Sequence, residues 1–181
     1  MRIISGEYKG FRFPQKNMPH ARPTTDRAKE ALFNVLDQRY YFQDLKVLDL
    51  YSGLGSMALE FCSRGVKDIT AVDLNRKSIT YIKEVVDKLN APLKVRQAKC
   101  VSFLKQTEDK YTIIFADPPY NQKQEIDALI DAVSNGDYLL PNGLFILEHQ
   151  SMAQVSHPAI VETREYGQST FSFFNFEDSN E

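Results

Sequence analysis

From residue 45 onward, the hydrophobic and polar positions of this chain alternate between two periods. Short apolar runs are separated by stretches in which apolar residues recur every three or four positions, as in amphipathic helices. This alternation predicts βαβ units, and therefore a parallel sheet with helices on both faces. The predicted strands cover residues 45–50, 68–74, 93–98, 111–116, 143–148, 160–166 and 169–176, and the predicted helices cover 56–64, 75–89, 100–106 and 123–134.

The two ends of the chain follow other patterns. Gly167-Gln168 joins the last two runs as an antiparallel hairpin, which completes a seven-stranded, mostly parallel sheet. Near the start, residues 2–5 and 10–13 predict a small hairpin, and Pro23-Thr24-Thr25-Asp26 begins a helix. We expect one α/β domain over residues 1–181, with 1–22 as an N-terminal extension and 23–181 as the core.

Composition narrows the class of protein. The 181 residues are 43% hydrophobic and 25% charged, which is typical of a globular domain, and no apolar run approaches the length of a membrane span. The start of the chain has no long apolar segment of the signal-peptide kind. Two cysteines and three scattered histidines predict neither a disulfide framework nor a metal site. We therefore expect a cytoplasmic protein with no metal and no membrane partner.

Charge is distributed unevenly along the chain. The net charge is −2, but residues 1–30 carry +4 and the rest carries −6. A basic N-terminal arm on an acidic body predicts a local contact with an anionic partner. An ordinary solvated surface is the alternative explanation.

Candidate binding residues follow the first two predicted strands. In doubly wound sheets, ligands bind outside the carboxyl ends of the strands. The first strand ends at Asp49-Leu50 and continues into Tyr51-Ser52-Gly53-Leu54-Gly55, whose glycines permit a tight turn close to a ligand. Asp73 ends the second strand and can accept hydrogen bonds from both hydroxyls of a ribose. Glycines that serve packing, and Asp73 as a helix N-cap, are the structural alternatives.

Two adenosine-containing cofactors compete for this pattern. Gly53-x-Gly55-x-x-Ala58 fits the dinucleotide fingerprint, so NAD is one reading. Asp49 favours S-adenosylmethionine, because a carboxylate can face the amino group of the methionine moiety but repels a pyrophosphate.

The run "YTIIFADPPY" decides between these cofactors. In a doubly wound sheet the ends of the first and fourth strands lie side by side, which places Asp117 and Tyr120 near the methyl-bearing end of the cofactor. The exocyclic amine of a base is a poor nucleophile, and Asp117 together with the carbonyl of Pro118 can accept its protons. Pro118 and Pro119 fix the backbone, and Tyr120 offers a face for stacking, worth ~1–3 kcal/mol.

With these residues in place, the sequence resembles the class I S-adenosylmethionine methyltransferases that act on exocyclic amines. It is most similar to the bacterial RsmD-type enzymes, which methylate guanine N2 in 16S rRNA. The similarity is carried by "RIISGEYKG", "RPTTDRAKEALFNVL", "VLDLYSGLGSMALEFCSRG" and "YTIIFADPPY". The resemblance implies a Rossmann-like fold, rRNA within a small ribosomal subunit or an assembly intermediate as substrate, and a monomer.

The resemblance also implies roles for individual residues. It implies catalytic roles for Asp117, Pro118, Pro119 and Tyr120, cofactor contacts from Asp49, Tyr51, Ser52, Gly53, Gly55, Asp73, Leu74, Cys100 and Asp117, and RNA contacts from Lys9, Arg12, Arg22 and Arg27.

This chain departs from the family pattern at three positions. Phe11 stands where an Arg is usual, Asp73 replaces a Glu, and Lys99-Cys100 stand where a carboxylate usually meets the adenine amine.

Guanine also suits a carboxylate, because its N1–H and N2–H₂ donors match two acceptor oxygens. The alternatives are a DNA adenine-N6 or cytosine-N4 methyltransferase, a non-catalytic RNA-binding module for ribosome assembly and, last, an NAD oxidoreductase. A DNA enzyme commonly carries a target-recognition domain, for which 181 residues leave no room.

Overall fold

The computed structural model describes residues 1–14, 24–119 and 123–177. The elements in chain order are α1 (Asp26–Asp37), η1 (Phe42–Asp44), β1 (Lys46–Leu50), α2 (Ser56–Ser63), β2 (Asp68–Asp73), α3 (Arg76–Leu89), β3 (Leu93–Gln97), α4 (Cys100–Gln106), β4 (Tyr111–Ala116), α5 (Lys123–Asn135), β5 (Leu139–Gln150), β6 (Ile160–Tyr166) and β7 (Ser169–Phe174).

These strands form a seven-stranded sheet in the order β3-β2-β1-β4-β5-β7-β6. The strands β1 to β5 pair in parallel, and β7 runs antiparallel to both of its neighbours, β5 and β6. The chain order reverses between β1 and β4, which makes their carboxyl ends the topological switch point of the sheet. The predicted fold class is confirmed at this level.

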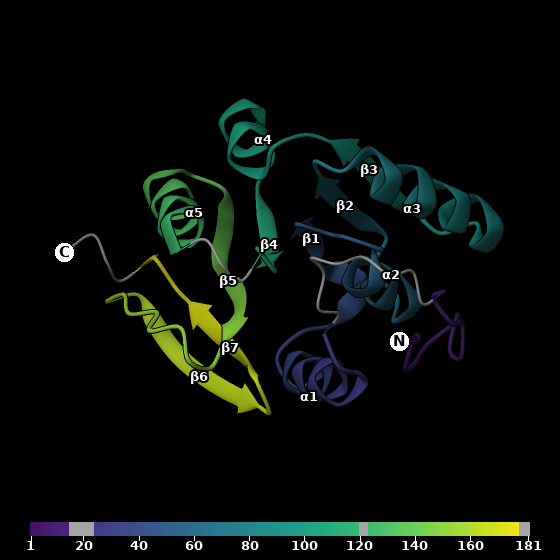
Figure 1. The fold of residues 1–181 in the computed structure, drawn as a ribbon, viewed down its shortest axis with the longest axis horizontal. Coiled ribbons are helices and arrows are strands. Elements are labelled where there is room, and N and C mark those ends of the chain that lie inside the picture. The colour runs from purple at the N-terminus through teal and green to yellow at the C-terminus, as the bar shows by residue number, and fades with distance from the viewer. Residues whose placement is uncertain (15–23, 120–122, 178–181) are drawn as a thin grey trace.

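Helices cover both faces of the sheet. Buried side chains of α1, α2 and α3 share one hydrophobic cluster with alternate residues of the strands, and those of α4 and α5 share a second cluster on the opposite face. Figure 1 shows α4 and α5 on one side of the strands and α1, α2 and α3 on the other. Membership of a cluster therefore tells which face a strand residue points to.

Three elements differ from the prediction. β5 begins at Leu139 rather than at 143, because it passes through Pro141-Asn142-Gly143, residues that normally indicate a turn, with a register shift against β4. The short helix η1 was not predicted. The predicted N-terminal hairpin is reduced to one antiparallel bridge between Arg2 and Arg12. No helix among the described residues is both long enough and apolar enough to cross a membrane.

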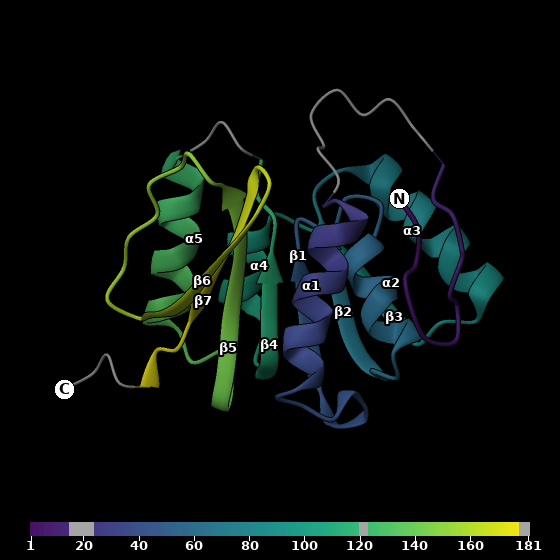
Figure 2. The ribbon, with the colours of Figure 1, turned by 90° about the horizontal axis from the view of Figure 1, so that it is seen from below.

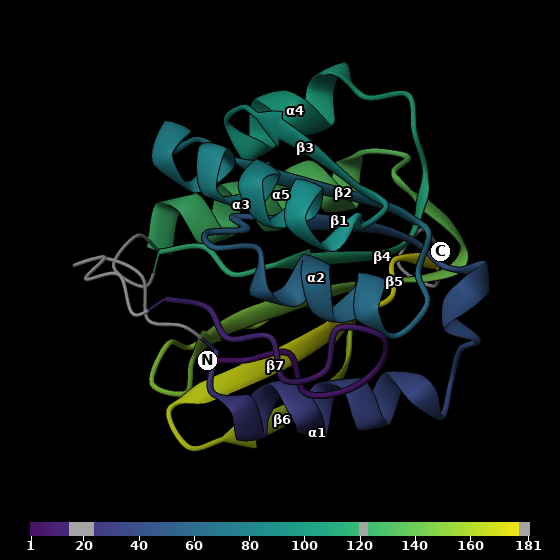
Figure 3. The ribbon, with the colours of Figure 1, turned by 90° about the vertical axis from the view of Figure 1, so that its right-hand side faces the viewer.

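The N-terminal segment, residues 1–14, is held by a buried carboxylate of α2. Glu60 accepts hydrogen bonds from the backbone N–H groups of Ile4 (2.9 Å) and Ser5 (3.1 Å), and its Oε2 lies 3.4 Å from the Nζ of Lys29 on α1. Both charged side chains of this pair are fully buried. Figure 3 shows the segment passing between α1 and α2. It is thus a fixed part of the core on that face.

Candidate active site

Three carboxylates lie at the carboxyl ends of neighbouring strands. Asp49 is in β1, Asp117 directly follows β4, and Glu148 is near the end of β5. Leu50 pairs with Ala116, and Ala116 with Leu147, so the residues that follow in β4 and β5 stand beside each other. Alternation places all three carboxylates on the face covered by α1, α2 and α3, because their neighbours two positions earlier belong to that cluster.

The surroundings of these carboxylates disfavour negative charge. Burial raises the pKa of Asp49 to about 8, although Ser52 and the backbone N–H of Ala58 (3.2 Å from Oδ2) stabilise its ionised form. Burial, followed by the negative charges of Glu148 and Asp49, holds the pKa of Asp117 well above its ordinary range. Burial also raises the pKa of Glu148 to about 7. The cluster therefore favours a cationic ligand.

No cation of the protein compensates this cluster in the part of the chain that the structure describes. The ion pairs there involve other carboxylates, such as Glu60, Asp68 and Glu162. The described residues also hold no group of three or more His, Cys, Asp or Glu arranged for a metal ion. The charge that the cluster favours is therefore left for a bound molecule to supply.

The glycine turn after β1 is braced by Asp73. Gly53 has a φ of +55°, and a Cβ added there would meet nothing within 4 Å, so open space lies beside the turn. The Asp73 carboxylate accepts hydrogen bonds from the N–H of Gly53 (2.8 Å) and of Asn75 (2.7 Å). Asn75, not Asp73, is the N-cap of α3, so the N-cap alternative is wrong. Gly55 packs closely, since its Cβ would come 3.0 Å from Ile82.

Tyr51 connects this turn with α4 and α5. It has a φ of +57°, which is uncommon for a residue with a side chain. Its N–H donates to the Sγ of Cys100 (3.3 Å), the first residue of α4. Burial, with Cys100 and the hydrogen-bonded carboxylate of Glu125 nearby, raises the pKa of the Tyr51 phenol. Cys100, whose pKa burial raises to about 12, is a neutral thiol at this position.

The other two predicted cofactor residues lie on either side of the turn. Ser52 donates its hydroxyl hydrogen bond to the carbonyl of Asp49 (2.7 Å) and thereby fastens the turn to β1. Leu74 is 58% exposed immediately after Asp73, which leaves an apolar surface beside the site. The predicted cofactor residues of β1, β2 and α4 are thus gathered at one edge of the sheet.

The predicted catalytic run begins where β4 ends. The N–H of Asp117 donates to the carbonyl of Leu50 (3.4 Å), which ties the start of the run to β1. Pro118 is buried and Pro119 is exposed. Tyr120 lies outside the described residues.

The predicted RNA contacts do not gather at one place. Lys9, Arg12 and Arg27 are exposed, and Arg22 lies outside the described residues. Arg12 pairs with Arg2, whose side chain meets Asp26 at the start of α1 (3.3 Å). Lys9 instead comes directly after Glu7 and Tyr8, whose backbone N–H groups donate to the carbonyl and the hydroxyl of Ser63 at the far end of α2. An eight-residue helix is ~12 Å long, so Lys9 is near the opposite edge of the sheet.

Sequence reasoning missed Glu148 and Thr24. Glu148 is fully buried and accepts a hydrogen bond from the Thr24 hydroxyl, just before α1. Figure 2 shows that α1 starts at the edge of the sheet to which β4 points. The available signal was a charged residue at the end of the apolar run "GLFILE", which is unusual for a central strand.

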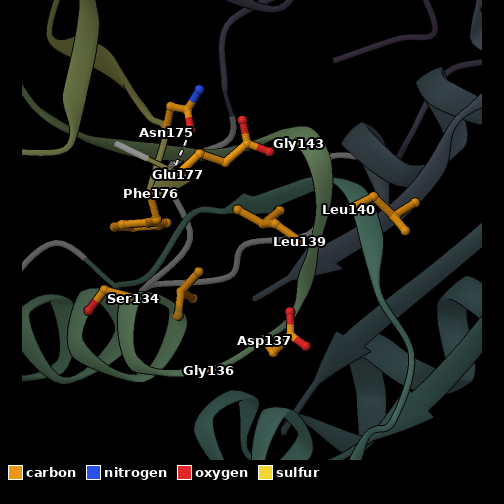
Figure 4. Close-up of a pocket in the computed structure, with 10 residues that line it drawn as sticks. Ser134, Gly136, Asp137, Leu139, Leu140, Gly143, Asn175, Phe176 and Glu177 are labelled. Atoms are coloured by element: carbon orange, nitrogen blue, oxygen red, sulfur yellow. Dashed lines mark hydrogen bonds between the residues drawn. The ribbon is translucent and has the colours of Figure 1, made fainter. Parts of the chain in front are cut away.

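A separate hollow of about 180 Å³ lies at the opposite edge of the sheet. Figure 4 shows it between the start of β5, with Leu139 and Gly143, and the residues after β7, with Asn175, Phe176 and Glu177. None of its lining residues belongs to the carboxylate cluster or to the glycine turn.

Comparisons with known proteins agree with this geometry. A family model described as conserved hypothetical protein 95 matches residues 1–175. The ribosomal RNA small subunit methyltransferase D of Buchnera aphidicola subsp. Baizongia pistaciae is 33% identical over 155 residues, which cover 83% of this chain and 76% of that protein. The protein of the same name from Escherichia coli K12 is 30% identical over 151 residues, covering 83% and 75%. A solved structure described as putative methyltransferase yhhF from Escherichia coli has a TM-score of 0.83 at 27% identity over 96% of both chains.

Proposed function

Because this chain belongs to the conserved hypothetical protein 95 family and has the Rossmann-like fold of class I methyltransferases, we propose that it is an rRNA methyltransferase that uses S-adenosylmethionine and modifies the N2 amine of a guanine. One observation carries the chemistry: Asp49, which pairs with Phe115, and Asp117, two residues further along, lie on the same face at the switch point of the sheet, without a cation from the described residues.

The residues around the glycine turn fit this cofactor. S-adenosylmethionine supplies an electrophilic methyl group on a positively charged sulfur, and it also carries an ammonium group. Asp49 offers that ammonium a buried carboxylate. Open space beside Gly53, the carboxylate of Asp73 and the exposed side chain of Leu74 would take the ribose and adenine. A pyrophosphate at the same place would face uncompensated carboxylates, which argues against NAD.

The residues after β4 suit an amine as the substrate group. The lone pair of an exocyclic amine is delocalised into the base, so the enzyme must accept hydrogen bonds from its N–H groups to orient that lone pair. The Asp117 carboxyl and the carbonyl of Pro118 are acceptors held in place by pairing to β1 and by two consecutive prolines. The ring of Tyr120 would stack on a base that is flipped out of the RNA.

Guanine is the base that best matches two neighbouring acceptors, which the carboxyl of Asp117 and the carbonyl of Pro118 would provide. Its N1–H and N2–H₂ groups are adjacent donors, whereas the Watson–Crick edge of adenine presents a donor beside an acceptor. Phosphate contacts by Arg12 and Arg27, both exposed near the start of α1, would position the RNA without reading its sequence. The acidic remainder of the chain predicts weak binding of naked RNA, so we propose a small ribosomal subunit or its assembly intermediate as the substrate.

A methyl-transfer assay tests this proposal. Labelled S-adenosylmethionine is offered with naked 16S rRNA, with small subunits that lack the modification, or with duplex DNA, and the labelled base is identified by nuclease digestion and mass spectrometry. We expect N2-methylguanine in the subunit sample. Label in DNA adenine or cytosine would favour the DNA enzyme, and no transfer despite RNA binding would favour an assembly module.

The Asp117→Ala variant tests the role of Asp117 in the chemistry. It should lower the rate of transfer by ~10² or more while cofactor affinity changes little, since a positioned catalytic group contributes about that much. A variant that retains nearly the full rate would show that Asp117 does not orient the amine.

A further inference from the structure

Glu148 is a buried carboxylate that the proposed mechanism has not used. It has no exposed surface, and it lies on the same face of the sheet as Asp117. Adjacent strands are ~4.8 Å apart, and the pairing of Ala116 with Leu147 places the two acids at the same level of β4 and β5. The negative charge of Glu148 raises the pKa of Asp117, so we expect the two acids to hold one proton between them.

The neighbours of Glu148 make it the charged member of this pair. The Thr24 hydroxyl donates to its Oε2, and the Ser169 hydroxyl on β7 also favours its ionised form. Oε1 has no partner at hydrogen-bond geometry among the described residues, so that oxygen remains available as an acceptor. The acids around Glu148 are Asp117, directly after β4, and, beyond it, Asp49 on β1.

The transfer reaction must dispose of one proton. When the amine nitrogen forms its bond to the methyl carbon, the carbon–sulfur bond breaks and its electron pair stays on sulfur. The nitrogen is then left with a proton that it has to lose. Asp117 can accept this proton at one oxygen while its own proton passes from the other oxygen to Glu148, so that no charge accumulates on the nitrogen.

We propose that Glu148 is the positioning residue that receives this proton through Asp117, with Thr24 holding it in place. The proposal rests on the methyl-transfer function proposed above. Thr24, just before α1, would thus take part in the chemistry through the hydrogen bond from its hydroxyl to Glu148, which is 124 positions later in the sequence.

The test is the pH dependence of a single turnover in four variants. The rate of methyl transfer by the wild type should fall below pH 7. Burial raises the pKa of Glu148 to about 7, and the protonated carboxyl cannot take up another proton. Glu148→Gln should be at least tenfold slower and should lack this acid limb, with cofactor affinity and thermal unfolding nearly unchanged. Glu165→Gln, an exposed change on β6, is the control and should match the wild type.

Two changes at Thr24 provide an independent test if Glu148→Gln does not fold. Thr24→Val removes the donor that lowers the pKa of Glu148, so the acid limb should move to higher pH, whereas Thr24→Ser should leave it in place. An unshifted limb in Thr24→Val, or a Glu148→Gln enzyme within twofold of the wild-type rate and with the same limb, would overturn the proposal.

A measurement without substrate separates this proposal from the proposed function. In protein labelled with ¹³C at the glutamate carboxyl carbon, the Glu148 signal is assigned by its loss in Glu148→Gln. We expect it to titrate near pH 7 both in the wild type and in Asp117→Asn, because burial raises the pKa of Glu148 and Asp117 is uncharged in that pH range. Titration at the ordinary value of about 4.3 would refute the shared proton even if the enzyme methylates RNA. Failure of methyl transfer with the expected titration would refute only the function.

Discussion

Replacing Glu60 by Gln removes the charge that holds the N-terminal segment. The carboxylate accepts hydrogen bonds from Ile4 and Ser5, lies 3.4 Å from the Nζ of Lys29 and meets the Nε of Arg64 at 2.9 Å. A Gln side chain preserves the shape but leaves Lys29 as a buried cation without its counter-charge. Breaking one side of a buried ion pair in this way costs about 3–5 kcal/mol.

Loss of a proton from Lys29 limits this cost. Burial already lowers the pKa of Lys29, against the opposing effect of Glu60. Deprotonating a lysine of ordinary pKa at pH 7 costs about 4.6 kcal/mol, at ~1.4 kcal/mol per pH unit. The unfolded variant then binds one proton more than the folded variant. The free energy of unfolding of the variant therefore rises with pH until the ordinary lysine pKa is reached. At pH 9 the part of the loss that comes from Lys29 should be at most about 1.9 kcal/mol.

Urea unfolding of the wild type and Glu60→Gln at pH 7 and pH 9 measures the loss of unfolding free energy at each pH. At pH 7 we expect a loss of about 3–4.6 kcal/mol, which corresponds to a fall in Tm of roughly 6–18 °C for a chain of this size. Glu165→Gln, which removes an exposed carboxylate, is the control and should change stability by less than about 0.5 kcal/mol. A loss below about 1 kcal/mol at pH 7, or an equal loss at both pH values, would refute the reasoning.

Three further predictions concern other parts of the molecule. Because burial raises the pKa of Asp49 to about 8, binding of the cationic cofactor should release protons, and its affinity should increase from pH 6 to pH 8. Calorimetry in two buffers measures the proton release and the affinity, and Asp49→Asn should bind the cofactor weakly at every pH. Gly6→Ala should destabilise more than Gly10→Ala in urea unfolding, because both have positive φ but only at Gly6 would the new Cβ meet a carbonyl oxygen, at 1.8 Å; equal losses would contradict this. Charge reversal at Arg12 or Arg27 should weaken substrate binding and lower its salt dependence by ~1 per lost phosphate contact, with cofactor affinity unchanged; an unaltered salt slope in filter binding would exclude a phosphate contact.

Local patterns predicted most of the fold because each element is specified by its own residues. The apolar run of β4 ends at Asp117, and that of β1 ends at Asp49-Leu50, so both site positions could be located before the strands were paired. The rule for doubly wound sheets predicted that the ends of β1 and β4 are adjacent, and the pairing of Leu50 with Ala116 confirms this.

Contacts between distant segments were not predictable in this way. The hydrogen bond from Thr24 to Glu148 joins residues that no local pattern relates: the charged residue at the end of "GLFILE" was visible in the sequence, but its partner was not. The pair of Lys29 and Glu60 was missed for the same reason, since each looks like a solvated residue on an amphipathic helix. The predicted start of β5 was wrong because Pro141 and its neighbours are residues typical of turns. Pairing with β4 overrides that local preference.

The order of strands in the sheet has a consequence for synthesis on the ribosome. β1, β2 and β3 are consecutive in the chain and adjacent in the sheet, so the half that bears the glycine turn and Asp73 can pair once residue 97 has been made. Glu148 follows 51 residues later, which at ~5–20 residues per second is a delay of roughly 3–10 s. During translation, the nascent chain therefore completes the half that would bind the cofactor several seconds before it can complete the half that would accept the proton.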